Sequence, residues 1–116
     1  MSKAGFEFVE RAPKAELHIH IEGSLEPDLL LRLAEKNSVV LPYKAIEDVT
    51  RAYQFQDLQS FLDLYYLGAS VLVDEGDFYE LMWRYLCRCR NEGIVHAEIM
   101  FDPQTHTRRG VSLETV

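Results

Sequence analysis

The sequence has few cysteines, an excess of acidic residues and no long apolar run, and each feature excludes a class of protein. Two cysteines among 116 residues are too few for a disulfide scaffold. The net charge of −7 opposes binding to nucleic acid and to anionic membranes, because both are negatively charged. No apolar stretch approaches the roughly 20 residues of a membrane span, and residues 1–7 lack a signal-peptide core. We therefore expect a cytoplasmic protein with no nucleic-acid or membrane partner.

The chain is long enough for one small domain, and its apolar content of 47% predicts a packed core. Residues 16–22 carry the clearest periodic pattern, a strict alternation that predicts a strand ending at Gly23. Its apolar members are Leu17, Ile19 and Ile21, and its polar members are Glu16, His18, His20 and Glu22.

Helical spacing dominates the middle of the chain. The first predicted helix runs from Pro27 to the Asn37-Ser38 stop, and a short one covers residues 47–51. Two longer helices are predicted over 58–73, with a cap near Asp57, and from about 75 to a stop at Gly93. A second strand is predicted over 94–101 and a loop over 102–107. Strands joined through helices should be parallel, with a right-handed crossover. Two parallel strands alone make no stable sheet, and residues 112–116 resemble a helix start. We expect residues 1–116 to be a single incomplete domain of a larger α/β protein.

The predicted first strand carries a candidate metal motif. Residues i and i+2 of a strand point to the same face, so His18 and His20 can converge on one ion. On a helix the same spacing would turn the two rings apart. The alternative is an amphipathic strand whose polar face meets water, since two histidines are fewer ligands than a catalytic zinc needs.

The segment from Pro13 to Leu25 resembles the opening strand of the adenosine/adenine deaminase family, with its Pro-Lys-x-Glu-Leu-His-x-His-x-acid-Gly signature. More loosely, residues 57–66 resemble the family's helix near the pocket mouth, and residues around 97–99 resemble its second strand. The resemblance implies an α/β fold, here the N-terminal third of a (β/α)8 TIM-type barrel. It also implies one Zn²⁺ per full-length subunit, held in part by His18 and His20, that activates water for purine deamination.

Two features favour the adenine branch of the family over the adenosine branch. Glu22 stands where adenosine deaminases usually carry aspartate, and its extra methylene would occupy space that a ribose needs. The run Phe101–Thr107 also resembles the adenine branch. A small purine base is thus the expected partner, with adenosine or an N6-substituted adenine as alternatives. A non-catalytic fragment or interaction module is the alternative of a different class.

The resemblance places substrate contacts at Glu22, Phe61 and Asp102. It places no catalytic acid or base within residues 1–116, so we expect this chain alone to bind zinc weakly and to be inactive. His96 and His106 are not assigned as ligands, and His96 is expected in the core or at the pocket rim. The neighbouring pair Arg108-Arg109 is expected to be a solvated charge pair.

Overall fold

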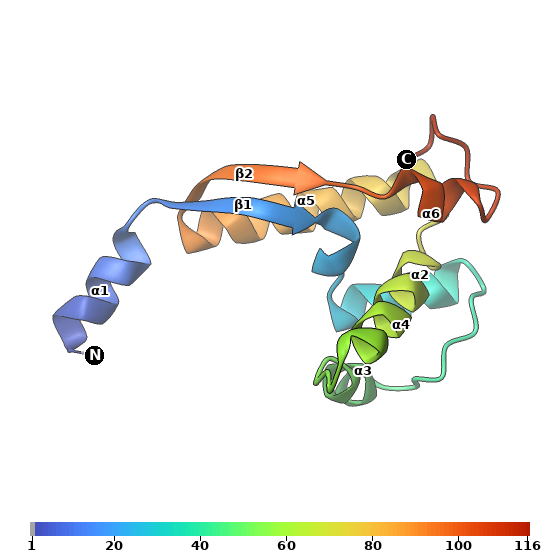
Figure 1. Ribbon diagram of the computed structural model, residues 1–116, viewed down its shortest axis with the longest axis horizontal. Helices are drawn as coiled ribbons and strands as arrows, with labels where there is room; N and C mark the ends of the chain where they lie inside the picture. The colour runs from blue at the N-terminus through green and yellow to red at the C-terminus, as the bar shows by residue number, and fades with distance from the viewer. Residues whose placement is uncertain (1) are drawn as a thin grey trace.

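The computed structural model describes residues 2–116, which form two parallel strands connected through helices (Figure 1). The elements in chain order are α1 (Lys3–Arg11), β1 (Lys14–His20), the 3-10 turn η1 (Ile21–Ser24), α2 (Pro27–Lys36), α3 (Ile46–Ala52), α4 (Leu58–Ala69), α5 (Glu75–Glu92), β2 (Ile94–Met100) and α6 (Pro103–Thr107). The predicted α/β class and the parallel strand pair are confirmed.

The two strands pair with an irregular register. Glu16 lies opposite Ala97 and Ile19 opposite Ile99, so β1 contains one residue more than β2 over this interval. This bulge changes which side chains share a face. Glu16 and Ile19, three residues apart, both line the hollow beside α5, which strict alternation would not allow. The strict period-two prediction for residues 16–22 is therefore wrong at Glu16.

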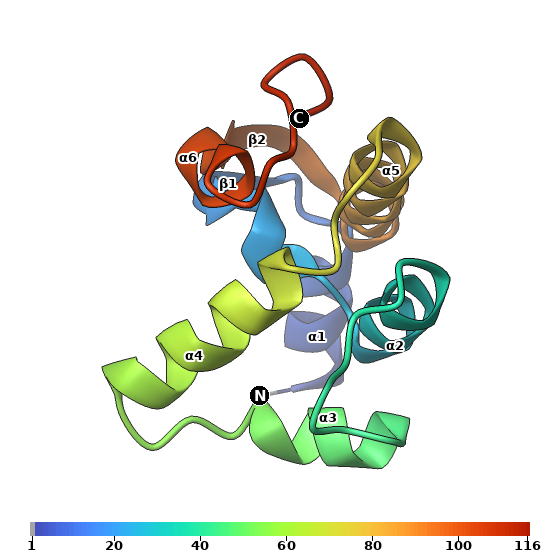
Figure 2. The same cartoon turned by 90° about the vertical axis from the view of Figure 1, so that its right-hand side faces the viewer.

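The helices cover one side of the strand pair, and the long α5 runs beside both strands (Figures 1 and 2). The predicted apolar stripe of α2 is buried, including Leu29, Leu30 and Leu33. Together with Val71, Leu72 and Leu81 these residues form the centre of the core. The core thus lies between the strand pair, α2 and α5, and it supports the carboxyl ends of the two strands.

Local capping signals mark the helix ends well. Asp57 accepts a hydrogen bond from the Ser60 backbone N–H at 2.8 Å and begins α4 as predicted. Gly93 ends α5 in the left-handed conformation, with φ of 73°. The expected helix over residues 47–51 is α3, and the helix from residue 75 is α5.

Five segments differ from the sequence-based expectation. The strand β1 ends at His20 rather than at Glu22, and α4 ends at Ala69 rather than at residue 73. The expected loop 102–107 contains the short helix α6, and residues 112–116 form a turn rather than a helix. The helix α1 was not expected from periodicity, and it buries none of its side chains. Among residues 2–116, no helix combines the length and the apolar character needed to cross a bilayer.

Candidate active site

A hollow of about 360 Å³ lies at the carboxyl end of β1 and gathers most of the predicted site residues. Its lining consists of His18, Ile19, His20, Gly23, Phe61, Leu62, Tyr65, Tyr66 and Asp102. The imidazole rings of His18 and His20 have their centroids 5.4 Å apart, as expected for i and i+2 side chains on one strand. Among residues 2–116, no group of three or more metal-binding side chains is brought together. The two histidines can therefore provide only part of a metal ligand set.

Asp102 reaches this hollow from the other strand, immediately after β2 ends. Its Oδ1 lies 3.6 Å from Nδ1 of His20, and its Oδ2 accepts a hydrogen bond from the Tyr65 hydroxyl at 2.5 Å. Burial of Tyr65, followed by its hydrogen bond to the Asp102 carboxylate, raises the pKa of the Tyr65 hydroxyl. The Tyr65 hydroxyl therefore keeps its proton over the physiological pH range and donates a hydrogen bond to Oδ2 of Asp102. The other carboxylate oxygen, Oδ1, faces His20.

Phe61 stands on α4 at the wall of the hollow, with 38% of its surface exposed. Its ring packs edge-on against Phe55, with centroids 5.1 Å apart, and lies 6.0 Å from the Tyr65 ring. These neighbours hold the Phe61 ring in place while leaving part of it open. A half-exposed, supported ring at a hollow is suited to contact with a flat aromatic ligand.

Glu22 lies deeper than the other predicted residues, because the η1 turn follows the strand and carries it inward. Its side chain is 1% exposed and does not line the hollow with the histidines. One carboxylate oxygen, Oε1, accepts from the Asp102 backbone N–H at 2.8 Å and is 2.9 Å from Nε2 of His106. The other oxygen lies 3.3 Å from the Tyr65 hydroxyl. Burial alone would raise the pKa of Glu22, but the His106 and Asp102 hydrogen bonds hold this pKa below its ordinary value.

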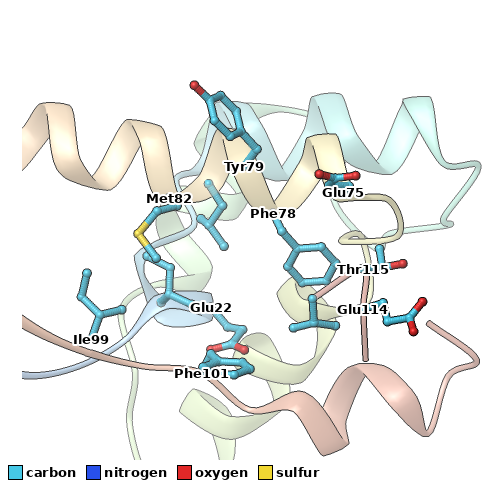
Figure 3. A pocket seen from close by; sticks show the side chains of 12 residues that line it. Glu22, Glu75, Phe78, Tyr79, Met82, Ile99, Phe101, Glu114 and Thr115 are labelled. Carbon is cyan, nitrogen blue, oxygen red and sulfur yellow. The ribbon is translucent and has the colours of Figure 1, made fainter. Parts of the chain in front are cut away.

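A second hollow, of about 490 Å³, is lined in part by Glu22. Phe78 and Met82 reach into it from α5, and Phe101 and Glu22 lie across from them (Figure 3). Its lining is mainly apolar and includes no histidine. Glu22 thus lines the apolar hollow and not the hollow that contains the histidines.

Besides Tyr65, His106 and Arg109 are polar residues of this region that sequence reasoning did not place at the site. His106 is fully buried on α6, and its ring packs edge-on against Phe78 with centroids 4.8 Å apart. Arg109 donates to Nδ1 of His106 and to the backbone carbonyls of Ala69, Ser70 and Leu72. Arg109 is exposed, as expected, but its guanidinium is not merely solvated, because it bonds these carbonyls at the C-terminal end of α4 and in the loop after it. The available local signal was the spacing of three between His106 and Arg109, which the turn after α6 brings together.

His96 lies on β2 away from this cluster. Its ring is 61% exposed, and its nearest charged partner is Glu98, at 3.5 Å. It is not buried in the core of the described residues, so that part of the expectation for His96 is wrong. His96 is also not among the residues lining the hollow of His18 and His20.

Comparison with known proteins identifies the family. The family profile described as adenosine deaminase matches residues 13–116, which is most of the chain. The chain belongs to the adenosine deaminase family. Within this family the predicted resemblance to the adenine branch is confirmed by relatives of high identity. The adenine deaminase of Wolinella succinogenes is 62% identical over 110 residues, which cover 95% of this chain and 33% of that protein. The adenine deaminase of Psychrobacter cryohalolentis is 59% identical, with the same coverage of both chains.

Solved structures confirm that this adenosine deaminase family member has the fold of the first part of a (β/α)8 barrel. The adenine deaminase of Arthrobacter aurescens matches with a TM-score of 0.84 and 56% identity, over 89% of this chain and 32% of that one. The N6-methyl-AMP deaminase of Arabidopsis thaliana matches with a TM-score of 0.68, over 92% of this chain and 31% of that one. Its identity of 24% makes that likeness one of fold alone. The chain spans about a third of the length of the curated relatives that it matches.

Proposed function

We propose that the whole protein is a zinc-dependent adenine deaminase, which converts adenine and water into hypoxanthine and ammonia. The observation that supports this most strongly is the hollow in which His18, His20, Phe61 and Asp102 meet. Its volume of about 360 Å³ is within the range of small-molecule sites. Identity of 54–62% to proteins named adenine deaminase supports the choice of substrate.

The proposed zinc site starts from His18 and His20. Two imidazoles side by side on one strand fit two ligand positions of Zn²⁺, and the further ligands come from outside residues 2–116. Asp102 beside Nδ1 of His20 fits the carboxylate that commonly orients a metal-binding histidine. This arrangement leaves Nε2 of His20 for the metal. When bound, zinc supplies an acidified water molecule as the source of the attacking oxygen.

The proposed contacts with the purine come from an aromatic ring and from a carboxylate. Phe61 offers a ring face to the flat base, and Asp102 offers a carboxylate to its N–H groups. Tyr65 keeps that carboxylate in place through its hydroxyl. Glu22 acts from beneath, because its side chain is 1% exposed and does not line the hollow, whereas Asp102 does. We therefore assign Glu22 to shaping the substrate loop rather than to direct contact with the base.

A substrate panel distinguishes this proposal from its alternatives. Purified whole protein should be assayed with adenine, adenosine and N6-methyladenine at equal concentrations, following the loss of each by liquid chromatography. We expect kcat/KM for adenine to exceed the other two by at least about tenfold, which corresponds to about 1.4 kcal/mol of transition-state binding. A higher kcat/KM for adenosine or for N6-methyladenine would contradict adenine as the substrate, but it would not contradict the proposed zinc site.

Zinc analysis tests the ligand assignment independently of turnover. In whole protein purified without added metal, His18→Ala and His20→Ala should each lower the bound zinc measured by mass spectrometry. His96→Ala is the matched control, a histidine of the neighbouring strand that lies 61% exposed beside Glu98, and it should retain zinc. Full zinc content in both His18→Ala and His20→Ala would contradict the assignment.

The isolated chain of residues 1–116 tests whether His18 and His20 are only part of the zinc ligand set. With only two of the proposed ligands, it should bind zinc weakly in calorimetric titration and show no adenine turnover. Measurable turnover by this chain alone would show that the described residues contain a complete catalytic site.

A further inference from the structure

A triad of the buried Glu22, the buried His106 and the exposed Arg109 connects the candidate site to the end of α4. We propose that this triad is a positioning device, in which Arg109 holds His106 as a fixed proton donor to Glu22 and Glu22 in turn holds the Asp102 loop. The proposal rests on the proposed function for its kinetic consequence. Its structural claim, a single fixed tautomer of His106, can be tested without any activity.

The donors and acceptors in the triad allow one arrangement of protons. A guanidinium has only N–H donors, so Nδ1 of His106, at 2.9 Å from the Arg109 nitrogen, must be the acceptor. The proton of the neutral ring is therefore on Nε2, which lies 2.9 Å from the Glu22 carboxylate and donates to it. Each polar atom of His106 thus has a partner of the correct kind, although the ring is fully buried.

Arg109 is itself fixed by the backbone. Its Nη1 donates to the Ser70 carbonyl at 3.1 Å, and the two N–H groups of its Nη2 are shared among the Ala69 carbonyl at 2.8 Å, the Leu72 carbonyl at 3.0 Å and Nδ1 of His106. These carbonyls end α4 and begin the loop toward α5, so they move only with that part of the core. The guanidinium therefore ties the position of His106 to the end of α4, through hydrogen bonds that are partly buried at Ala69, Leu72 and His106 and exposed at Ser70.

Glu22 links His106 to Asp102, which lines the hollow that contains the histidines. The same oxygen that accepts from His106 also accepts from the Asp102 backbone N–H, which sets where β2 ends and α6 begins. Its second oxygen faces the Tyr65 hydroxyl, and Tyr65 in turn donates to Asp102. Loss of the His106 donor would free Glu22 to turn, and the Asp102 side chain would then shift relative to His20. The expected consequence is weaker binding of the substrate.

The tautomer is measured by ¹⁵N NMR of the whole protein labelled at its histidine ring nitrogens, with the His106 signals assigned from their loss in His106→Gln. The proposal expects a proton on Nε2 and none on Nδ1. In Arg109→Leu, the fixed preference should be lost, and the ring should show a mixture of states. A proton on Nδ1 of His106 in the unaltered protein would overturn the proposal, whatever the enzyme does.

Steady-state kinetics on the whole protein test the functional consequence. His106→Leu and Arg109→Leu should each raise KM for adenine about tenfold, the effect of one lost positioning hydrogen bond. His106→Gln should recover most of this loss, because its amide N–H₂ can donate to Glu22 and its carbonyl can accept from Arg109. The matched control is Arg108→Leu, an exposed neighbour of Arg109, which should leave KM unchanged.

A merely structural role gives a different result. It would lower the amount of folded enzyme and hence the maximal rate, but it would leave KM unchanged and would not distinguish Gln from Leu at position 106. An unchanged KM in both leucine variants overturns the positioning claim. If one leucine variant does not fold, the comparison uses the other together with His106→Gln. If the unaltered protein does not deaminate adenine, the proposed function fails, and the tautomer measurement still decides whether the triad is fixed as described.

Discussion

Replacing Glu22 by aspartate tests whether this residue acts through its neighbours or through direct contact with the substrate. The substitution keeps the charge and removes one methylene. Because Glu22 sits on the η1 turn, its carboxylate needs its full length to reach His106 and the Asp102 backbone N–H. Aspartate at this position would withdraw the acceptor from both donors.

The cost of Glu22→Asp follows from the two donors that lose their acceptor. His106 is fully buried, so its unpaired N–H costs about 1–3 kcal/mol. The Asp102 N–H is only partly buried and adds roughly 1 kcal/mol. The variant should therefore be about 2–4 kcal/mol less stable. At the lower limit of about 2 kcal/mol, a protein of about 150–250 residues would show a fall in Tm of about 4–8 °C, and the longer whole protein should show a smaller fall.

The assay combines thermal unfolding of the whole protein with kinetics on adenine and adenosine. Glu47→Asp is the matched control, an exposed glutamate in the first turn of α3, and it should change Tm little. We expect Glu22→Asp to lower Tm and not to create adenosine turnover. A variant that is as stable as the unaltered protein and gains adenosine turnover would refute the reasoning, because Glu22 would then act by excluding the ribose directly.

Two further predictions concern stability of the whole protein. Asp77 is buried and accepts from Lys36 at 2.6 Å, so Asp77→Ala should cost about 3 kcal/mol in chemical denaturation. Burial alone would raise the pKa of Asp77, but Lys36 and the surrounding N–H donors hold that pKa below its ordinary value. The contribution of Asp77 to the free energy of unfolding should therefore be complete above about pH 4 and should diminish as the pH falls further. Equal stabilities of the Asp77→Ala variant and the unaltered protein at pH 7 would contradict this prediction. Gly93→Ala should cost about 1–2 kcal/mol because φ is 73° there, whereas Gly68→Ala, whose added Cβ meets Leu25 at an ordinary 3.5 Å, should be neutral or stabilising. Equal Tm values for the two alanine variants would show that backbone conformation does not decide the difference.

Most of the fold could be predicted from the sequence because its signals are local. The stripe of α2, the Asp57 cap of α4 and the Gly93 stop of α5 each depend on residues within a few positions of one another. The direction of His18 and His20 also follows from local alternation, and the two rings do lie together. These parts of the site needed no knowledge of distant contacts.

The parts that could not be predicted depend on contacts between distant segments. The bulge in β1 exists only relative to its partner β2, and it moves Glu16 to the side of α5. Arg109 meets the end of α4 from about 40 positions away, and this contact coincides with the early end of that helix. Glu22 continues the alternation in the sequence, but the η1 turn takes it out of the strand and into buried contact with His106. Its surroundings could be learned only from the fold.

The most direct test of the proposed deamination is a product analysis with isotopically labelled water. Whole protein carrying zinc is incubated with adenine in H₂¹⁸O, and the purine product and ammonia are both quantified. The account predicts hypoxanthine with one ¹⁸O atom and one ammonia for each adenine consumed. Adenine that stays intact with the zinc-loaded protein, or a product without ¹⁸O, would contradict the account.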